Sequence, residues 1–535
     1  MSLSLTNNKK NKKNDLLLTK KPETTIKPNN IEESHDGVLL KIFILITTFK
    51  ILLIPTYHST DFEVHRNWLA ISHSLPINEW YINNTSEWTL DYPPLFAWFE
   101  LILSQIGKLI DPEMLRVNNL NYASFSTKLF QRSTVMITDI FLVFGAREIG
   151  KVYHDNFNKL MIYYILTICN IGLLMIDHIH FQYNGFLLGI LLLSIAQVSK
   201  NQPMSILIGA AYFAILLNLK HLYLYVAPVF IVWLIKWYCM KGNFLIRLIQ
   251  LGSIVIGVLA ISFGPFITQL PQVFSRLFPF KRGLVHAYWA PNFWALYIGA
   301  DKILSVLWKK FGLLVMNKRA AMTGGLVQED TLAVLPTPTP IITFLLTILT
   351  IMPILVIILK KKTNLLRPHD FLRGLILCGL SSFMFGWHVH EKAILTAIIP
   401  MCIMATIDPI DGRIFLILSA TGHASILPLL YPDNLVVLKI LLLLIHIILA
   451  DYLLCKLFKF SLLKIYEYFY ILLLPIVAIY HAFIHKIIFD EKMEFLPLAL
   501  TSLYSAIGIT YCWILYFYYF YTNNYQLSNN SIKNK

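Results

Sequence analysis

The chain has 535 residues, of which 56% are hydrophobic and only 14% are charged, and its mean hydropathy is +0.61. This composition excludes a large soluble globule, because many apolar runs are long enough to cross about 30 Å of hydrocarbon. The formal net charge is +15. Its lysines gather in the N-terminal tail and in short polar connections, so the excess indicates membrane topology and not a nucleic-acid surface.

The N-terminal tail, residues 1–37, is rich in Asn and Lys and lacks aromatic residues. It is predicted to be disordered and cytosolic, because it cannot bury enough surface to fold. We expect no cleavable signal peptide, so the first apolar run should serve as both signal anchor and first span. A transmembrane domain follows over residues 38–520, and a polar C-terminal tail over residues 521–535.

The transmembrane domain is predicted to be all-α, with roughly 12 to 15 membrane-spanning helices of about 20 residues each. After the first span, the expected spans begin near Pro94, Ser133, Leu160, Phe181, Met204, Leu222, Leu248, Ile341, Phe371, Ala393, Arg413, Leu435, Tyr466 and Leu496. Two stretches, residues 58–93 and about 271–340, are neither spans nor short loops. Their richness in Trp, Tyr and Phe argues against disorder, so we expect two functional loops outside the membrane.

The first long loop opens with TDFEVHRNW and ends with WTLDYPPLF. Asp61 and Glu63 follow closely after the first span, where burial can raise the pKa of a carboxylate and make it a general base. Asp91 is a further candidate, and the prolines after it hold Tyr92 at the boundary of the next apolar run. The alternative is that these carboxylates cap helices and pair with Arg66.

Polar side chains also gather in DHIHFQYNG, at the entrance of an apolar run. His180, Gln182 and Asn184 are candidates here, because polar side chains at membrane depth are costly and by default functional. Hydrogen bonds between helices are the alternative explanation.

Aromatic residues interleave with polar ones in FPFKRGLVHAYWAPNFW, within the second long loop. Arg282, His286 and Trp289 could bind a sugar by ring stacking and by hydrogen bonds to its hydroxyls. An interfacial aromatic belt would give the same pattern.

The segment FGWHVHEKAIL places several hydrogen-bond donors at a span boundary. His388, His390 and Lys392 suit a phosphate-bearing ligand whose hydrocarbon tail lies in the bilayer, and Glu391 could orient them. A snorkelling pair that caps a helix is the alternative. The HVHE spacing fits neither a helical HExxH site nor a closed Cys/His site, so no metal is expected.

Two connections have a positive-inside character, residues 236–247 and residues 360–373, and both should face the cytosol. The HVHEK segment then falls on the far side of the membrane, the same side as TDFEVHRNW. Overlapping glycosylation sequons at Asn83 and Asn84 agree with a lumenal first loop.

Together these segments, with LKHLYLYVAPVF, resemble the endoplasmic-reticulum glucosyltransferases that use dolichyl-phosphate glucose. The resemblance runs from about Leu39 to the last spans. Two such enzymes add the first and the second glucose to the lipid-linked oligosaccharide. SEWTLDYPPLFAWFE and HAYWAPNFW are more similar to the enzyme that acts on the mono-glucosylated acceptor and forms an α-1,3 linkage.

The resemblance implies a C-type glycosyltransferase fold, two long lumenal loops and an inverting transfer that needs no metal or other cofactor. The acidic residue of the family's DFE motif falls on Asp61, the expected general base. The VHEK motif falls on His390, Glu391 and Lys392, expected with His388 at the donor phosphate. Acceptor-orienting candidates are Glu63, Arg66, Trp88, Asp91 and Tyr92. Further phosphate ligands remain open among Arg66, Lys220, His221 and Arg282.

The expected partners are the two lipid-linked substrates and membrane lipid, with no nucleic acid. The sister enzyme that adds the first glucose is one alternative. A secondary transporter also has many spans and intramembrane charges, but it should show paired repeats with broken helices, and the sequence has neither. A non-catalytic membrane subunit would have no need for Asp61 together with His390, Glu391 and Lys392 (the HEK residues).

Overall fold

The computed structural model describes residues 35–533 except 155, 279–282, 286–288, 313–331 and 491, and for 525–533 the backbone alone. Arg282, His286 and most of the expected N-terminal tail therefore lie outside the described residues. In the described part, the only β pairing is one bridge between Val285 and Val389. The prediction of an all-α protein is confirmed.

The N-terminal half consists of α1 (His35–Leu52), α2 (Thr60–Ser74), α3 (Pro94–Ile110), α4 (Phe125–Thr138), α5 (Ile140–Tyr153), α6 (Phe157–Ile168), α7 (Ile171–Leu173), α8 (Asn184–Ser199), α9 (Pro203–Leu219), α10 (Ala227–Trp237) and α11 (Phe244–Phe263). A π-helical segment, Leu174–Phe181, continues α7. The C-terminal half consists of α12 (Leu270–Leu277), α13 (Phe293–Lys310), α14 (Pro340–Lys360), α15 (Pro368–Phe385), α16 (Leu395–Ala405), α17 (Pro409–Ile426), α18 (Val436–Phe458), α19 (Ile465–Ile479), α20 (His485–Phe489) and α21 (Leu496–Lys533).

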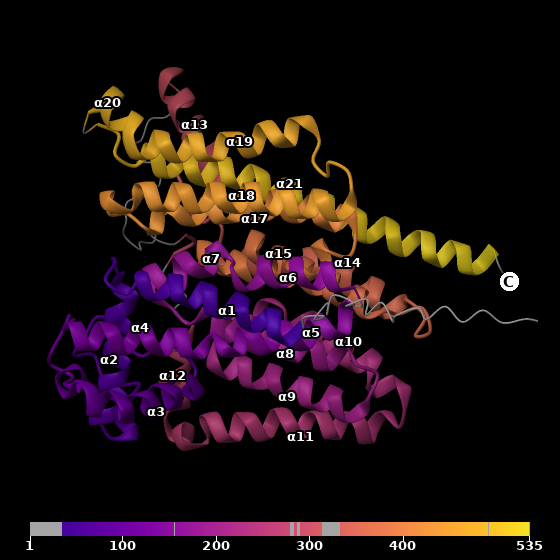
Figure 1. Cartoon of the computed structure of the whole chain (residues 1–535), viewed down its shortest axis with the longest axis horizontal. Helices are drawn as coiled ribbons and strands as arrows, with labels where there is room; N and C mark the ends of the chain where they lie inside the picture. The colour runs from indigo at the N-terminus through magenta and orange to yellow at the C-terminus, as the bar shows by residue number, and fades with distance from the viewer. Residues whose placement is uncertain are drawn as a thin grey trace, which may run out of the picture.

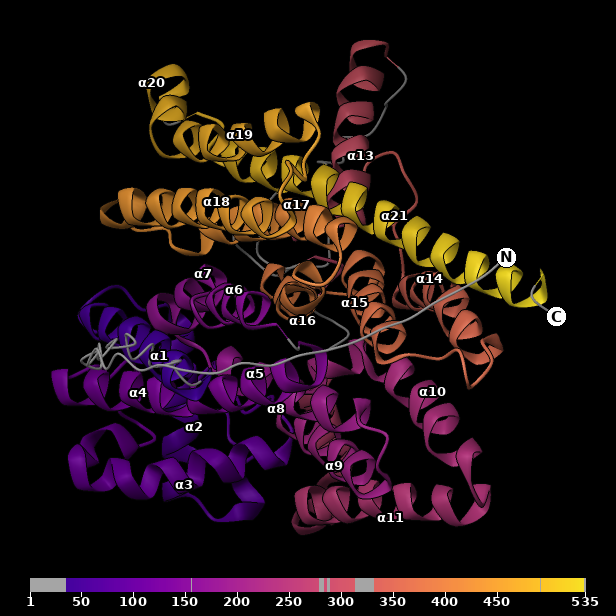
Figure 2. The same ribbon diagram turned by 45° about the vertical axis from the view of Figure 1, so that its right-hand side comes forward.

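The long helices of the two halves form two stacked groups (Figure 1). The N-terminal helices lie below and helices α17 to α19 and α21 above, while α13 packs on α21 at one end and projects beyond it at the other (Figure 2). Helix α21 continues to Lys533 and so includes most of the residues of the expected polar C-terminal tail.

Eight helical segments of the described chain are long and apolar enough to cross a membrane by length and composition. They are Phe125–Tyr153, Phe157–Phe181, Phe244–Leu277, Pro340–Lys360, Pro409–Leu429, Asp433–Phe458, Ile465–Phe489 and Leu496–Asn524, and α8 and α9 are shorter apolar helices. The predicted 12 to 15 spans also counted helices such as α1, which holds three charged side chains, and the 11-residue helices α10 and α16.

The helix expected to span the membrane from Pro94 is α3, which has 17 residues and is not one of these eight segments. One of its faces is buried and includes Phe96 and Glu100, whereas Ile102, Ile106 and Leu109 are exposed. The difference arises from its length, because α3 is shorter than the roughly 20 residues that a span needs. Its buried face packs on α2.

Helix α8 forms the centre of the N-terminal group, between α5 and α9. Its sequence is apolar all round, which is typical of a helix buried on every side. Close approach to α5 requires glycine, because a Cβ on Gly145 would lie 2.5 Å from the carbonyl oxygen of Gly189.

The two positively charged connections, between α10 and α11 and between α14 and α15, lie at one end of the bundle (Figure 1). Helices α2, α3 and α12 lie at the opposite end (Figure 1). This arrangement agrees with the expectation that the TDFEVHRNW segment and the positive connections are on opposite sides of the membrane.

The two long loops contact each other and the HVHEK segment. Gln272 and Arg276 of α12 donate hydrogen bonds to the carbonyl oxygen of Tyr81 in the first loop, at 3.0 and 3.2 Å. The backbone N–H of His388 donates to the carbonyl of Leu284 in the second loop at 3.0 Å. Three segments that are distant in the sequence therefore meet at the α2 end.

Candidate active site

The largest described cavity that contains the predicted polar residues has a volume of about 880 Å³ and lies at the α2 end. Its walls come from the first loop, the segment after the π-helix, the HVHEK segment and the turn after α17. The acidic, basic and amide side chains in its wall are Asp61, His65, Glu87, Asp91, His180, Gln182, His388, His390 and Lys392.

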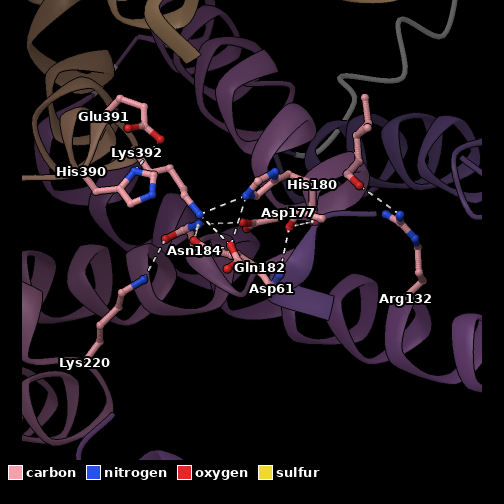
Figure 3. Close-up of polar contacts among 12 residues, drawn as sticks. Asp61, Arg132, Asp177, His180, Gln182, Asn184, Lys220, His390, Glu391 and Lys392 are labelled. Carbon is pink, nitrogen blue, oxygen red and sulfur yellow. Dashed lines mark hydrogen bonds and ion pairs between the residues drawn. The ribbon is translucent and has the colours of Figure 1, made fainter. Parts of the chain in front are cut away.

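Asp61 is the centre of a hydrogen-bond network in this wall (Figure 3). Its Oδ2 accepts from Lys392 Nζ at 2.6 Å and from Gln182 Nε2 at 2.7 Å, and it lies 3.2 Å from His180 Nε2. The Asp61 side chain is 23% exposed, so it is held by protein donors yet can be reached from the cavity. Asn184 donates to Gln182 Oε1 at 2.9 Å and so fixes the amide that faces Asp61.

The N-terminus of α2 positions Asp61. Ser59 caps this helix, because its Oγ accepts from the Asp61 N–H at 3.1 Å. The same hydroxyl donates to the carbonyl of His180 at 2.7 Å, which ties α2 to the π-helical segment. The guanidinium of Arg132 caps that segment, since it donates to the carbonyls of His178 and Ile179.

Two residues beside the network have a left-handed backbone that is uncommon for a side-chain-bearing residue. Phe181 has φ 88° and His388 has φ 52°. Phe181 turns the chain between His180 and Gln182, and His388 turns it before His390. Strained conformations of this kind persist where the surroundings fix them, and they concentrate at functional sites.

Burial and neighbouring charges shift the pKa values of Asp61 and His390. Burial alone would raise the pKa of Asp61, but the charge of Lys392 and the hydrogen bond to His180 together hold it well below its usual value. Burial, and after it the charge of Lys392, lowers the pKa of His390 well below its usual value. His390 is therefore a neutral imidazole that contacts Glu391 at 2.5 Å.

A smaller cavity of about 240 Å³ adjoins the large one. Both are lined by Asp91, Tyr92, Gln182, His388, His390 and Lys392. The smaller cavity is also lined by Asn184, Lys220, His221 and Arg276. The Lys220 ammonium lies 5.0 Å above the ring of Tyr92 and donates to Asn184 Oδ1 at 3.4 Å.

The structure thus brings most of the predicted site residues together. Those in the wall of the large cavity are Asp61, Trp88, Asp91, Tyr92, His180, Gln182, His388, His390 and Lys392. Four of the described residues that the sequence predicted do not lie in either wall, and one of them is Glu391, which is fully buried. Glu63 and Arg66 form a buried bidentate pair at 2.7 and 2.8 Å, and Trp289 packs in a separate core beside α13 and α21.

Several residues of the cavity walls were not singled out from the sequence. They are Tyr57, Thr60, Glu87, Arg276 and Tyr431, of which Thr60 directly precedes Asp61 in the charged TDFEVHRNW segment. The buried pair of Lys50 and Asp139, 2.6 Å apart, was also missed. The sequence could have indicated this pair, because each of its residues is a charged side chain in an otherwise apolar run.

In the described residues, no three His, Cys, Asp or Glu side chains gather in a way that could hold a metal ion. The two cavities instead combine the carboxylates of Asp61, Glu87 and Asp91 with the cations of Lys392, Lys220 and Arg276 and with neutral donors. Such a wall can activate a hydroxyl and stabilise negative charge that grows on a leaving group. At one end of a bundle of apolar helices, it defines a membrane-embedded transferase.

The chain belongs to the ALG6, ALG8 glycosyltransferase family, whose model matches residues 46–516. A Bos taurus relative is 50% identical over 494 residues, which cover 88% of this chain and 93% of the relative. A Drosophila melanogaster relative is 47% identical and a Schizosaccharomyces pombe relative 43% identical, over 89% and 91% of this chain and 93% and 99% of their own. Their names include dolichyl pyrophosphate Glc1Man9GlcNAc2 alpha-1,3-glucosyltransferase, with "probable" for the fly protein.

We expect Glu63→Ala to destabilise the protein by about 3–5 kcal/mol, because it leaves the buried guanidinium of Arg66 without its carboxylate. The free energy of unfolding in detergent micelles is the measurement. Glu113→Ala is the matched control. It breaks an exposed pair with Arg116, whose side chains are 44% and 71% exposed, and should cost at most about 1 kcal/mol. A normal stability together with a raised acceptor KM would instead place Glu63 at the substrate.

Proposed function

We propose that the chain transfers glucose from dolichyl-phosphate glucose to the mono-glucosylated lipid-linked oligosaccharide, with formation of an α-1,3 linkage. The names of relatives that are 43–50% identical over about nine-tenths of the chain support this acceptor and this linkage. The observation that carries the chemistry is the contact between Asp61 and Lys392 in the wall of the large cavity. The product serves protein N-glycosylation.

Asp61 acts as the general base. It takes the proton of the acceptor hydroxyl as the oxygen attacks C1 of glucose, and the bond from C1 to the phosphate oxygen breaks on the opposite face. A β-linked donor then gives an α-linked product in a single inverting step. The low pKa of Asp61 keeps its carboxylate ionised at neutral pH, and its partial exposure lets a hydroxyl approach.

Lys392 and His390 stabilise the leaving dolichyl phosphate. This group departs as a stable anion, so it needs electrostatic support and not a general acid. Lys392 lines both cavities and now pairs with Asp61, and a donor phosphate would compete for its ammonium. As the phosphate draws Lys392 away, Asp61 becomes a stronger base, which couples donor binding to activation of the acceptor.

We place the protein in the endoplasmic-reticulum membrane with its cavities facing the lumen. The positively charged connections at the opposite end of the bundle support this orientation, because such connections stay in the cytosol. Residues 1–37 and 521–535 would then be the N-terminal and C-terminal tails that flank the transmembrane glycosyltransferase domain in the sequence. The cations of the site supply charge stabilisation, so we propose that transfer requires no metal.

The purified protein should transfer glucose to a lipid-linked acceptor that already bears one glucose, and not to one that bears none. The assay supplies dolichyl-phosphate glucose and EDTA with each acceptor separately. Transfer only to the unglucosylated acceptor would make the chain the first-glucose enzyme. Activity that disappears with EDTA and returns with a divalent ion would contradict the metal-independent mechanism.

Asp61→Asn should reduce turnover by at least about 10²-fold, which is the lower range for loss of a general base. The asparagine keeps the size of the side chain and can still accept from Gln182, so folding and donor binding should persist. Turnover is measured with both substrates saturating, and donor binding is measured separately. Turnover near that of the unchanged protein would remove Asp61 as the base.

The apparent donor KM should rise as the pH increases through about 8. Burial, and after it the charge of Lys392, lowers the pKa of Lys220 to about 8 against the opposing carboxylates of Asp177, Asp61 and Asp91. Lys220 is charged below this pH and loses its charge above it, whereas the donor phosphodiester keeps its charge. Lys220→Arg should flatten the profile, because arginine stays protonated. An identical rise in this variant would exclude Lys220 as its cause.

A further inference from the structure

The wall of the large cavity combines two kinds of side chain. One set is Asp61 with its cationic and amide partners. The other set is made up of the aromatic side chains of Tyr57, Trp88 and Tyr431, with the carboxylate of Glu87. The rings of Tyr57 and Tyr431 meet edge to face at 5.1 Å, although they come from the two different halves of the chain.

The smaller cavity differs from the large one in the charged side chains of its wall. Lys220, His221 and Arg276 line it and do not line the large cavity. Asp61 lines the large cavity and not the small one. Lys392 and His390 lie in the wall that the two cavities share. At this shared wall the donor phosphate in the small cavity would lie close to the carboxylate of Asp61 in the large one.

Inverting displacement restricts how two substrates can share these cavities. The attacking hydroxyl and the leaving phosphate must lie on opposite faces of the sugar carbon. The hydroxyl must reach Asp61, which is accessible from the large cavity, and the phosphate is attracted by the cations of the small cavity. The acceptor sugar therefore binds in the large cavity, whose wall includes these aromatic rings.

On the basis of the proposed function, we propose that Tyr57, Trp88 and Tyr431, with Glu87, form the subsite that binds the terminal sugar of the acceptor. Aromatic rings stack on the C–H faces of a pyranose, and a carboxylate accepts hydrogen bonds from its hydroxyls. The cavity volume of about 880 Å³ is within the usual range for a ligand site and leaves room for a sugar beside the catalytic groups.

Tyr431 is the best position for a test, because its side chain is 72% exposed and its loss should leave the fold intact. We expect Tyr431→Ala to raise the acceptor KM about fivefold or more, in the range of one lost aromatic contact. The donor KM should stay within about twofold. Tyr431→Phe keeps the ring and should restore most of the acceptor affinity.

Phe311→Ala is the matched control, because Phe311 is 71% exposed and does not line either cavity. It should leave both KM values unchanged. The assay uses dolichyl-phosphate glucose with the mono-glucosylated lipid-linked oligosaccharide, and each substrate is varied while the other saturates. Thermal unfolding of each variant in the same detergent tests whether the fold is intact.

The assays distinguish a failure of the proposed function from a failure of the proposed acceptor subsite. If the unchanged protein transfers glucose to neither acceptor, the proposed function fails. If the unchanged protein is active but Tyr431→Ala has a normal acceptor KM, or raises the donor KM instead, the acceptor subsite is wrong and the proposed function stands.

Discussion

The ion pair between Asp61 and Lys392 is the contact on which the site depends. The two residues are 331 positions apart in the sequence, one at the start of α2 and the other just before α16. Their contact requires the N-terminal and C-terminal helical groups to be docked on each other. The cavity and the low pKa of Asp61 follow from that docking, and the proposal that Asp61 is the base rests on both.

A set of buried charged side chains holds the π-helical segment Leu174–Phe181 in place. Asp139 pairs with Lys50 at 2.6 Å and with His178 at 2.8 Å, and all three side chains are almost fully buried. Arg132 caps the carbonyls of the π-helical segment that ends at Phe181. Unpaired charges at this depth would cost several kcal/mol, so each is paired or hydrogen-bonded. The result is a rigid support for His180 and Gln182, the partners of Asp61.

The sequence indicated much of the site because charged side chains are conspicuous among apolar runs. Asp61 and the HEK residues were found in this way, and the structure brings them together. Glu63 shows why the same signal is insufficient. On a helix, residues two positions apart point in different directions, whereas residues three apart share a face. Asp61 therefore faces the cavity, and Glu63 pairs with Arg66 on the buried side.

The sequence by itself determined the all-helical membrane fold and its family, and it singled out the clusters that contain the candidate base and the candidate phosphate ligands. These properties depend on local composition and on spacing along the chain. Only the tertiary structure decided that Tyr431 and Arg276 line the cavities, that Trp289 belongs to a separate core, and that α3 packs on α2. Burial and cavity walls arise from contacts between distant segments, and local sequence patterns do not encode which of those segments meet.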